Sequence, residues 1–244
     1  MNKIFCFLAM VTVSAASGLL ATELTLDFVS PGNNPVGFYY VSPYTAEIKG
    51  TGQLLTLYCI DFDHEIAPPE EWTARIEPFD FANLPNMQNG GSSNPSATWL
   101  RYEAAAWLIP QLAQEPNDAQ GLYQQAIYQY AAWEVFLDAA HTPAFNASEA
   151  AAGGSSFITQ VNTAYNDALA AASNGFNLSG WDIVTGVPAG QPNSPQEFLV
   201  RDSAPEPSSL ILLATVLGAV TFLAIRRNAT SALKAEPGQK RSQS

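Results

Sequence analysis

The sequence has few cysteines, histidines and basic residues. Its 244 residues contain two cysteines, two histidines and ten Lys and Arg, against 22 Asp and Glu. Cys6 belongs to an apolar stretch near the start, so residues 22–207 contain a single cysteine, Cys59. A lone cysteine excludes a disulfide within this part. It leaves three interpretations of Cys59: a reactive thiol, an intermolecular bond or an inert buried side chain.

The shortage of basic residues is strongest in the body of the chain. Residues 22–207 contain 21 acidic residues and four basic ones, a formal charge of −17. Because phosphate binding depends on Lys and Arg, this charge excludes nucleic acid as a partner. An acidic surface of this kind suits solubility, bound cations or neutral glycans.

Familiar catalytic motifs are missing as well. The sequence contains no G-x-S-x-G, no H-E-x-x-H and no phosphate-binding glycine loop. The run Asp61-Phe62-Asp63-His64-Glu65 lacks the spacing of a calcium loop and has no clustered second His or Cys for zinc. We therefore predict a protein that is not an enzyme, with no cofactor or metal. The DFDHE carboxylates are expected to be solvated at an exposed strand end.

Long runs without charge occur near the two ends. Lys3 is followed by the apolar run 4–13 and then by small residues, the layout of a signal peptide, which we assign to residues 1–21 in preference to a leader ending at Ala16. Residues 208–225 are uncharged and, as a helix, span roughly 27 Å, which predicts a transmembrane helix. The basic residues behind it predict a cytoplasmic tail at 228–244, so that residues 22–203 form the exported domain.

The C-terminal elements occur in a recognisable order. Pro205-Glu206-Pro207, the apolar run and Arg226-Arg227 together resemble the PEP-CTERM sorting signal of exopolysaccharide-producing bacteria. The resemblance covers residues 204–227 and implies that an exosortase recognises the triplet and removes the membrane span. It also implies export through the inner membrane, temporary anchoring in the bilayer, and delivery to the cell surface or extracellular matrix. The tail after Arg227 is longer than is usual in that family.

Between these ends, the hydrophobic period changes twice. Short aromatic and β-branched stretches predict strands, and two capped segments and a third, alanine-rich one predict helices between them. The predicted strands are 24–29, 36–41, 53–62, 72–79, 181–187 and 197–201, and the predicted helices are 96–114, 118–138 and 155–172. The fold class is therefore α+β: an antiparallel sheet or sandwich with a helical insertion, plus the C-terminal transmembrane helix.

Cys59 lies on the strand predicted at 53–62. Alternation along this strand places Cys59 on the same face as Leu55 and Leu57, turned inward. The simplest interpretation is a small buried hydrophobe with an inert thiol.

A second interpretation comes from two short motifs. Tyr58-Cys59-Ile60-Asp61 on a strand and Gln124-Gln125-Ala126-Ile127-Tyr128 on a helix resemble the bacterial thioester domain. The resemblance implies a β-structure with a helical subdomain. It also implies that the Cys59 sulfur displaces ammonia from the Gln124 amide, with Gln125 as the adjacent alternative. Tyr128 stands where the family often has Trp. The resulting thioester would react with an amine, such as a partner's lysine, and form a covalent bond.

Three functions remain open. The first is an exported surface or matrix protein that attaches through a thioester to exopolysaccharide or surface amines. The second is a non-covalent structural or glycan-binding matrix protein in which Cys59 is inert. Trp72, in a polar stretch, is then the best candidate for an exposed sugar platform. A carbohydrate-active enzyme comes third, because paired carboxylates can be far apart in sequence.

Overall fold

A computed structural model describes residues 22–191 and 194–201. The predicted signal peptide, the sorting motif with the 208–225 span, and the basic tail lie outside these residues. Among the helices in the described ranges, none is both long enough and apolar enough to cross a membrane.

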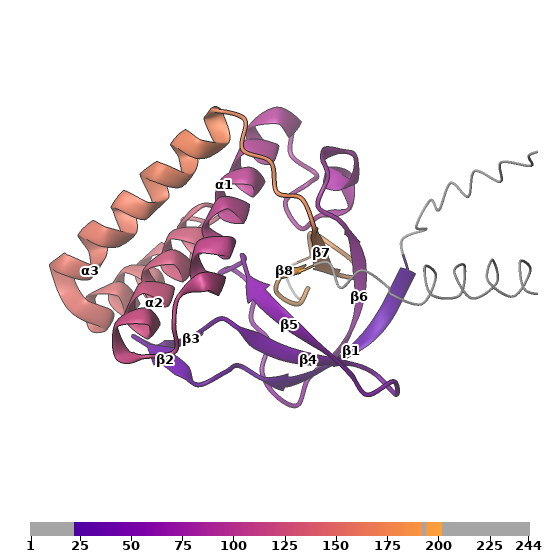
Figure 1. The fold of residues 1–244 in the computed structure, drawn as a ribbon. Coiled ribbons are helices and arrows are strands. Elements are labelled where there is room, and N and C mark those ends of the chain that lie inside the picture. The colour runs from indigo at the N-terminus through magenta and orange to yellow at the C-terminus, as the bar shows by residue number, and fades with distance from the viewer. Residues whose placement is uncertain (1–21, 192–193, 202–244) are drawn as a thin grey trace, which may run out of the picture. The chain divides into compact units, whose positions relative to one another are not determined.

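Six strands form a closed antiparallel barrel (Figure 1). They are β1 (Thr22–Ser30), β4 (Tyr44–Ile48), β5 (Gln53–Cys59), β6 (Glu71–Pro78), β7 (Trp181–Gly186) and β8 (Phe198–Arg201). The order around the barrel is β1-β4-β5-β8-β7-β6. The mixed class with an antiparallel sheet is confirmed. The sandwich alternative is wrong, because the late strands β7 and β8 join β5 to β6 and close the sheet into a barrel.

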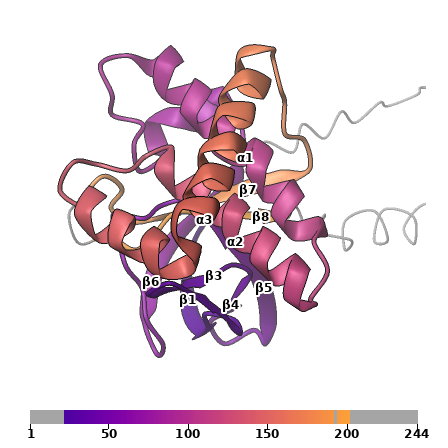
Figure 2. The same ribbon diagram turned by 90° about the vertical axis from the view of Figure 1, so that its left-hand side faces the viewer.

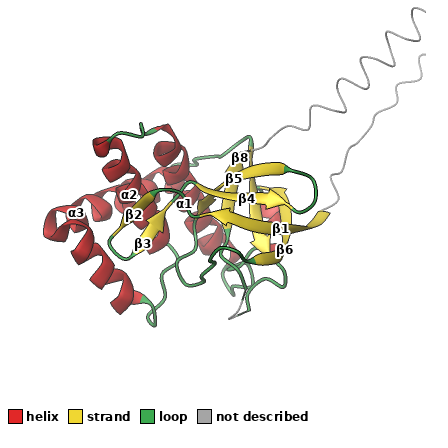
Figure 3. Cartoon of the chain, turned by 90° about the horizontal axis from the view of Figure 1, so that it is seen from below, coloured by secondary structure: helices red, strands yellow, loops and turns green. Residues whose placement is uncertain are grey.

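A small hairpin lies beside the barrel (Figure 3). Strands β2 (Asn34–Val36) and β3 (Tyr39–Val41) replace the single strand predicted at 36–41. The chain reverses at Gly37, whose φ is 61°, and a Cβ there would collide with the hydroxyls of Ser148 and Tyr130. Only glycine fits both the positive φ and this close approach. Strand β4 was not predicted.

The helices are inserted between β6 and β7, as the sequence predicts. The short 3₁₀ helix η1 (Phe81–Asn86) precedes α1 (Pro95–Gln114), α2 (Ala119–Glu134) and α3 (Thr142–Ser173), which pack on one another at one side of the barrel (Figures 1 and 2). Asn94 and Asp118 cap α1 and α2 with their side-chain oxygens. Pro110 lies inside α1, which ends at Gln114 as predicted. Helix α3 begins well before the predicted residue 155 and breaks at Gly153 and Gly154.

The apolar core extends from the barrel interior to the helices. Trp72 belongs to this core: it is 6% exposed and contacts Phe28 and Phe198 edge-on or tilted. The prediction of an exposed sugar platform at Trp72 is therefore wrong. Its polar neighbours on β6 point outward, and the two-residue period of the strand turns Trp72 and Ala74 inward.

Candidate functional site

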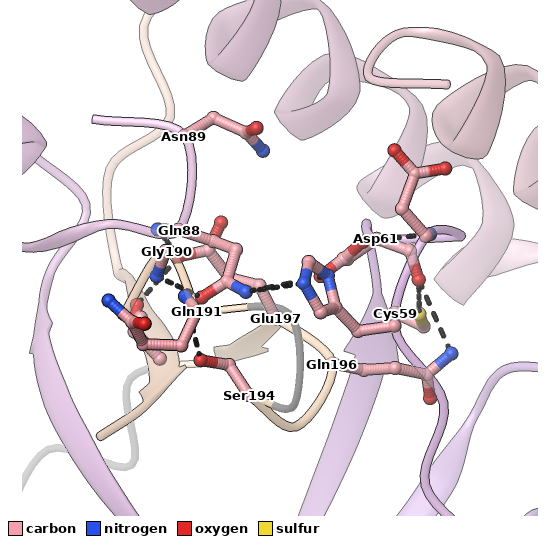
Figure 4. Close-up of polar contacts among 12 residues, drawn as sticks. Cys59, Asp61, Gln88, Asn89, Gly190, Gln191, Ser194, Gln196 and Glu197 are labelled. Atoms are coloured by element: carbon pink, nitrogen blue, oxygen red, sulfur yellow. Dashed lines mark hydrogen bonds and ion pairs between the residues drawn. The ribbon is translucent and has the colours of Figure 1, made fainter. Parts of the chain in front are cut away.

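Cys59 ends β5 and is completely buried, which confirms its predicted inward orientation with Leu55 and Leu57. The indole Nε1 of Trp133 on α2 donates a hydrogen bond to the Cys59 sulfur over 3.2 Å. The thiol in turn donates to the backbone oxygen of Asp61 at 3.1 Å (Figure 4). Burial is the main cause that raises the pKa of the Cys59 thiol, and the nearby Asp61 carboxylate adds to it. The thiol is therefore neutral at physiological pH.

The glutamine in contact with Cys59 is Gln129, in the middle of α2 and fully buried. Its Nε2 donates to the Cys59 backbone oxygen over 2.6 Å, and its Oε1 accepts from the Ser42 backbone N–H over 3.2 Å. The Ser42 hydroxyl oxygen accepts from the Cys59 N–H at 2.9 Å. The three residues thus form a closed ring of contacts that fixes the Gln129 amide against the Cys59 backbone.

The two glutamines singled out from the sequence lie elsewhere on α2. Gln124 lines a different hollow, together with Trp107 and Gln160. Gln129 lies five positions after Gln124 on the helix, so their side chains point about 140° apart around the axis. Gln125 lies one turn before Gln129 and donates to the Glu115 backbone oxygen and the Asn117 side chain. Of these three glutamines, the structure therefore brings Gln129 to Cys59.

A signal for Gln129 was present in the sequence. In the helix predicted at 118–138, Ala126, Tyr130 and Trp133 follow one another at helical spacings of four and three residues and form an apolar stripe. Gln129 lies three residues after Ala126 and four before Trp133, within this buried stripe. A polar side chain at such a position needs buried hydrogen-bond partners, which here are the backbone groups of Cys59 and Ser42.

The arrangement brings together the components of an acyl transfer. The Cys59 thiol is a potential nucleophile, and the Gln129 amide carbon is a potential electrophile. The Ser42 N–H already donates to Gln129 Oε1, where negative charge would develop during attack on that carbon. All three groups are buried, so bulk water is excluded from them.

An aromatic hollow of about 270 Å³ lies on the other side of Trp133. Its walls come from the β2–β3 hairpin, the segment after β5, helix α2, the residues before β8 and the barrel strands β1 and β4. They include Phe38, Tyr39, Tyr40, Glu65, Trp133 and Gln196. Trp133 therefore lines this hollow and is at the same time hydrogen bonded to the Cys59 sulfur.

A buried carboxyl group, Glu197, lies next to the same end of β5. Its Oε1 accepts from the Gln88 N–H at 2.9 Å and the Thr185 hydroxyl at 2.6 Å, and its Oε2 accepts from the Tyr102 hydroxyl at 2.6 Å. Burial raises the pKa of Glu197 to about 7, against these three hydrogen bonds, which lower it. Gln88 also contacts His64: its side-chain Nε2 lies 3.0 Å from His64 Nε2, while its backbone N–H binds Glu197 (Figure 4).

The DFDHE run is more enclosed than predicted. Asp61 is 3% exposed and lies 2.7 Å from His64 Nδ1, so the prediction of a solvated carboxylate is wrong at this position. The hydrogen bond to Asp61 is the main cause that raises the pKa of His64. Asp63 meets Asp138 and His141 from the α2–α3 connection, with ligand-type atoms within 4.8 Å of one another. His141 pairs with both carboxylates, and the prediction that no metal binds stays a prediction.

Comparisons with known proteins gave one weak structural similarity. No protein-family model and no curated protein sequence matches this chain. A solved structure, the N-terminal thioester domain of a protein F2-like fibronectin-binding protein from Streptococcus pneumoniae, matches with a TM-score of 0.40 and 11% identity. The match covers 73% of this chain and 92% of that chain. At this TM-score the similarity decides nothing about function, which has to be inferred from the contacts around Cys59.

Proposed function

We propose that this domain forms an internal thioester between Cys59 and Gln129 and uses it to attach covalently to amines. The observation that carries the proposal is the fully buried contact between the Gln129 side-chain amide and the Cys59 backbone oxygen, at the residue that bears the thiol. In this proposal Gln129 replaces Gln124 and Gln125 as the acyl donor. The protein acts once and is consumed, so it is not an enzyme.

The reaction has two balanced steps. In the first, the Cys59 sulfur attacks the Gln129 side-chain carbon; a sulfur–carbon bond forms, the carbon–nitrogen bond breaks, and the amide nitrogen leaves as ammonia with the thiol proton. In the second, an incoming amine attacks the same carbon. A carbon–nitrogen bond forms, the sulfur–carbon bond breaks, and the amine proton returns to sulfur as the Cys59 thiol.

Two features of the surroundings support the thioester. The Ser42 N–H donates to the oxygen of the reacting carbonyl, which would stabilise the tetrahedral intermediate of both steps. Trp133 donates to the sulfur, which would stabilise the thiolate that leaves in the second step. Complete burial would protect the thioester from water until a partner docks.

The site of action is a further part of the proposal. We infer from the sequence that the domain is exported through the inner membrane and anchored by residues 208–225. An exosortase would then process it at the Pro205-Glu206-Pro207 motif and release it to the cell surface or matrix. Cell fractionation with antibodies against the domain and against the last 17 residues tests this. Detection of full-length protein, leader included, in the cytosol would refute it.

The experiment for the thioester is mass spectrometry of the full-length protein. We expect the native mass to be lower by one ammonia. Methylamine should then add to one glutamine within the tryptic fragment 102–201, and fragmentation should assign the adduct to Gln129 rather than Gln124 or Gln125. The Gln129→Ala and Cys59→Ala variants should lack both the mass deficit and the adduct.

The matched control is Gln124→Ala, which removes a glutamine from the same helix but not from the site. It should keep the mass deficit and the adduct. An adduct on Gln124 would refute the assignment to Gln129. A full native mass with no adduct on any glutamine would refute the thioester itself.

A second function has one observation in its favour. Burial raises the pKa of the Cys59 thiol and so opposes formation of the nucleophilic thiolate. If the mass experiment finds no thioester, the protein is a non-covalent structural or glycan-binding component with an inert Cys59. A thiol that reacts with iodoacetamide only after denaturation would identify this case.

A further inference from the structure

The aromatic hollow next to Trp133 has the properties of a small ligand site. Phe38 and Tyr40 at its rim are 69% and 48% exposed, which is unusual for large apolar side chains. Its floor is a cluster of edge-to-face or tilted rings: Tyr39 lies 4.8 Å from Phe62, and Phe62 lies 5.4 Å from Trp133, between ring centroids. The volume of about 270 Å³ is slightly below the range of drug-sized sites, roughly 300 to 1,000 Å³, and suits one monosaccharide-sized group.

The rim is held in place before any ligand binds. The Phe38 N–H donates to the Ser148 hydroxyl at 2.9 Å, and the Tyr44 hydroxyl donates to the Tyr40 backbone oxygen at 2.6 Å. The backbone that carries the two exposed rings is therefore held by α3 on one side and by the barrel on the other. Such preorganisation lowers the entropy lost on binding.

Two polar side chains, Glu65 and Gln196, line the hollow and would orient a bound ligand. Glu65 is exposed at its edge. The pKa of the Tyr39 phenol is raised mainly by burial and in addition by the nearby Glu65 carboxylate. Gln196 also lines the hollow, and its Nε2 donates to the Asp61 backbone oxygen, which accepts the Cys59 thiol. A ligand in the hollow thus meets a carboxylate at the edge. Through Gln196 and Trp133 it also comes close to the residues around the sulfur.

We infer that this hollow binds one residue of a polysaccharide with free amines, a glucosamine-type sugar. Aromatic rings pack against the apolar C–H faces of a sugar ring, and Glu65 pairs with its ammonium group. The formal charge of −17 over residues 22–207 attracts a cationic polymer and repels an anionic one. Covalent capture of the sugar rests on the proposed thioester, whereas binding in the hollow does not.

The amine of such a sugar is also suited to attack the proposed thioester. Neighbouring hydroxyl-bearing carbons withdraw electrons, so the amine loses its proton at a lower pH than lysine, whose pKa is about 10.4. More of it is therefore the free, nucleophilic base at neutral pH. Its nitrogen would bond to the Gln129 carbon, and the sulfur would leave with the amine proton as the Cys59 thiol.

The binding test uses the full-length Cys59→Ala variant, which cannot form a thioester. A glucosamine tetramer is titrated by calorimetry, with the N-acetylglucosamine tetramer as a matched neutral ligand. We expect the amine form to bind at least about ten-fold more tightly, as one charge-assisted contact would give. In the Cys59→Ala background, a further Glu65→Gln exchange should remove this preference and leave the residual stacking.

The rim is tested in the same background with two surface variants. Phe38→Ala should weaken binding of the glucosamine tetramer by about ten-fold or more. Phe81→Ala is the matched control, because Phe81 is an aromatic residue of 49% exposure that lines another hollow, and it should change nothing. Equal affinity for the two tetramers, or equal effects of the two Phe variants, would overturn the inference.

The covalent step is measured separately on the full-length protein with an intact Cys59. A glucosamine adduct on Gln129 supports capture of the bound sugar. If methylamine reacts and the glucosamine tetramer neither binds nor reacts, the hollow assignment fails and the thioester stands. If the tetramer binds but no amine reacts, the thioester fails and the hollow assignment stands.

Discussion

Two buried polar sites lie on adjacent strands at the same end of the barrel. Cys59 ends β5 and pairs with Phe198 of β8, and Glu197 immediately precedes Phe198. The Ile60 N–H donates to the Glu197 backbone oxygen at 3.0 Å. Despite this proximity, the two side chains have different surroundings.

Both oxygens of Glu197 accept hydrogen bonds from distant parts of the chain. The donors are the N–H of Gln88 after η1, the hydroxyl of Tyr102 on α1 and the hydroxyl of Thr185 on β7. Because they come from three elements, Glu197 joins the helical insertion to the barrel. A carboxyl with this many partners is a structural group.

Cys59 has weaker partners. A thiol is a poor donor and a poor acceptor, so its contacts with Trp133 and Asp61 add little stability. A small apolar residue would fill the position nearly as well. The weak partners of this cysteine, next to a buried glutamine amide, are what the proposed thioester would explain and packing alone would not.

The largest effect on stability should follow from Glu197→Ala. The change leaves three buried donors without an acceptor, each costing about 1–3 kcal/mol, so we expect a loss of about 5 kcal/mol. Urea unfolding measures it. Both proteins are first treated with methylamine, because a thioester closing the loop from residue 59 to 129 would itself add about 4 kcal/mol.

The conservative variant Glu197→Gln keeps one acceptor oxygen and should lose clearly less than Glu197→Ala. A loss below about 1 kcal/mol for Glu197→Ala would show that its partners find other acceptors or water. The contrast between Glu197 as a structural group and Cys59 as a weakly bonded one would then be wrong.

The next largest effect should appear as a pH dependence. Burial raises the pKa of Glu197 from 4.5 to about 7, so the folded state holds this proton more tightly than the unfolded state. The resulting stability is complete below about pH 4.5 and is lost as pH rises through 7, by about 3 kcal/mol. Urea midpoints between pH 4.5 and 8 measure this slope.

Matched variants assign the slope. Glu197→Gln should remove most of it. Burial also raises the pKa of Glu149 to about 7, with the same sign, so part of the slope should remain in this variant. Cys59→Ala should leave the slope unchanged, because the neutral thiol does not titrate in this range. An unchanged slope in Glu197→Gln would contradict the assignment.

How far the sequence predicts this molecule depends on the range of the interactions. Alternation along 53–59 predicts an inward Cys59, and the changed period predicts a helical insertion after β6, because both follow from neighbouring residues. Closure of the barrel does not follow from them. It depends on β8 pairing with β5 from some 140 residues away, and on the short β4, whose sequence YTAEI carries little strand signal.

The candidate site, too, depends on long-range contacts that local sequence patterns do not predict. From the sequence we selected Cys59 and the helix that packs against it, but the motif match pointed to Gln124, whereas Gln129 of that helix contacts Cys59. Which glutamine faces Cys59 depends on how α2 is rotated against β5, and the contacts of Trp133 and Tyr130 fix that rotation. The ring with Ser42 joins three elements and leaves no local pattern.

The smallest effect should come from Ser42→Ala, on the Cys59 side of the comparison. The change removes the hydroxyl that accepts the Cys59 N–H, which costs about 1–2 kcal/mol if that donor stays unsatisfied. The backbone N–H of residue 42, which donates to Gln129, remains. We therefore expect modest destabilisation in urea with the methylamine adduct on Gln129 retained. A loss as large as that of Glu197→Ala would mean that the ring around Cys59 is itself a structural support, and the distinction between a reactive site and a structural one would no longer hold.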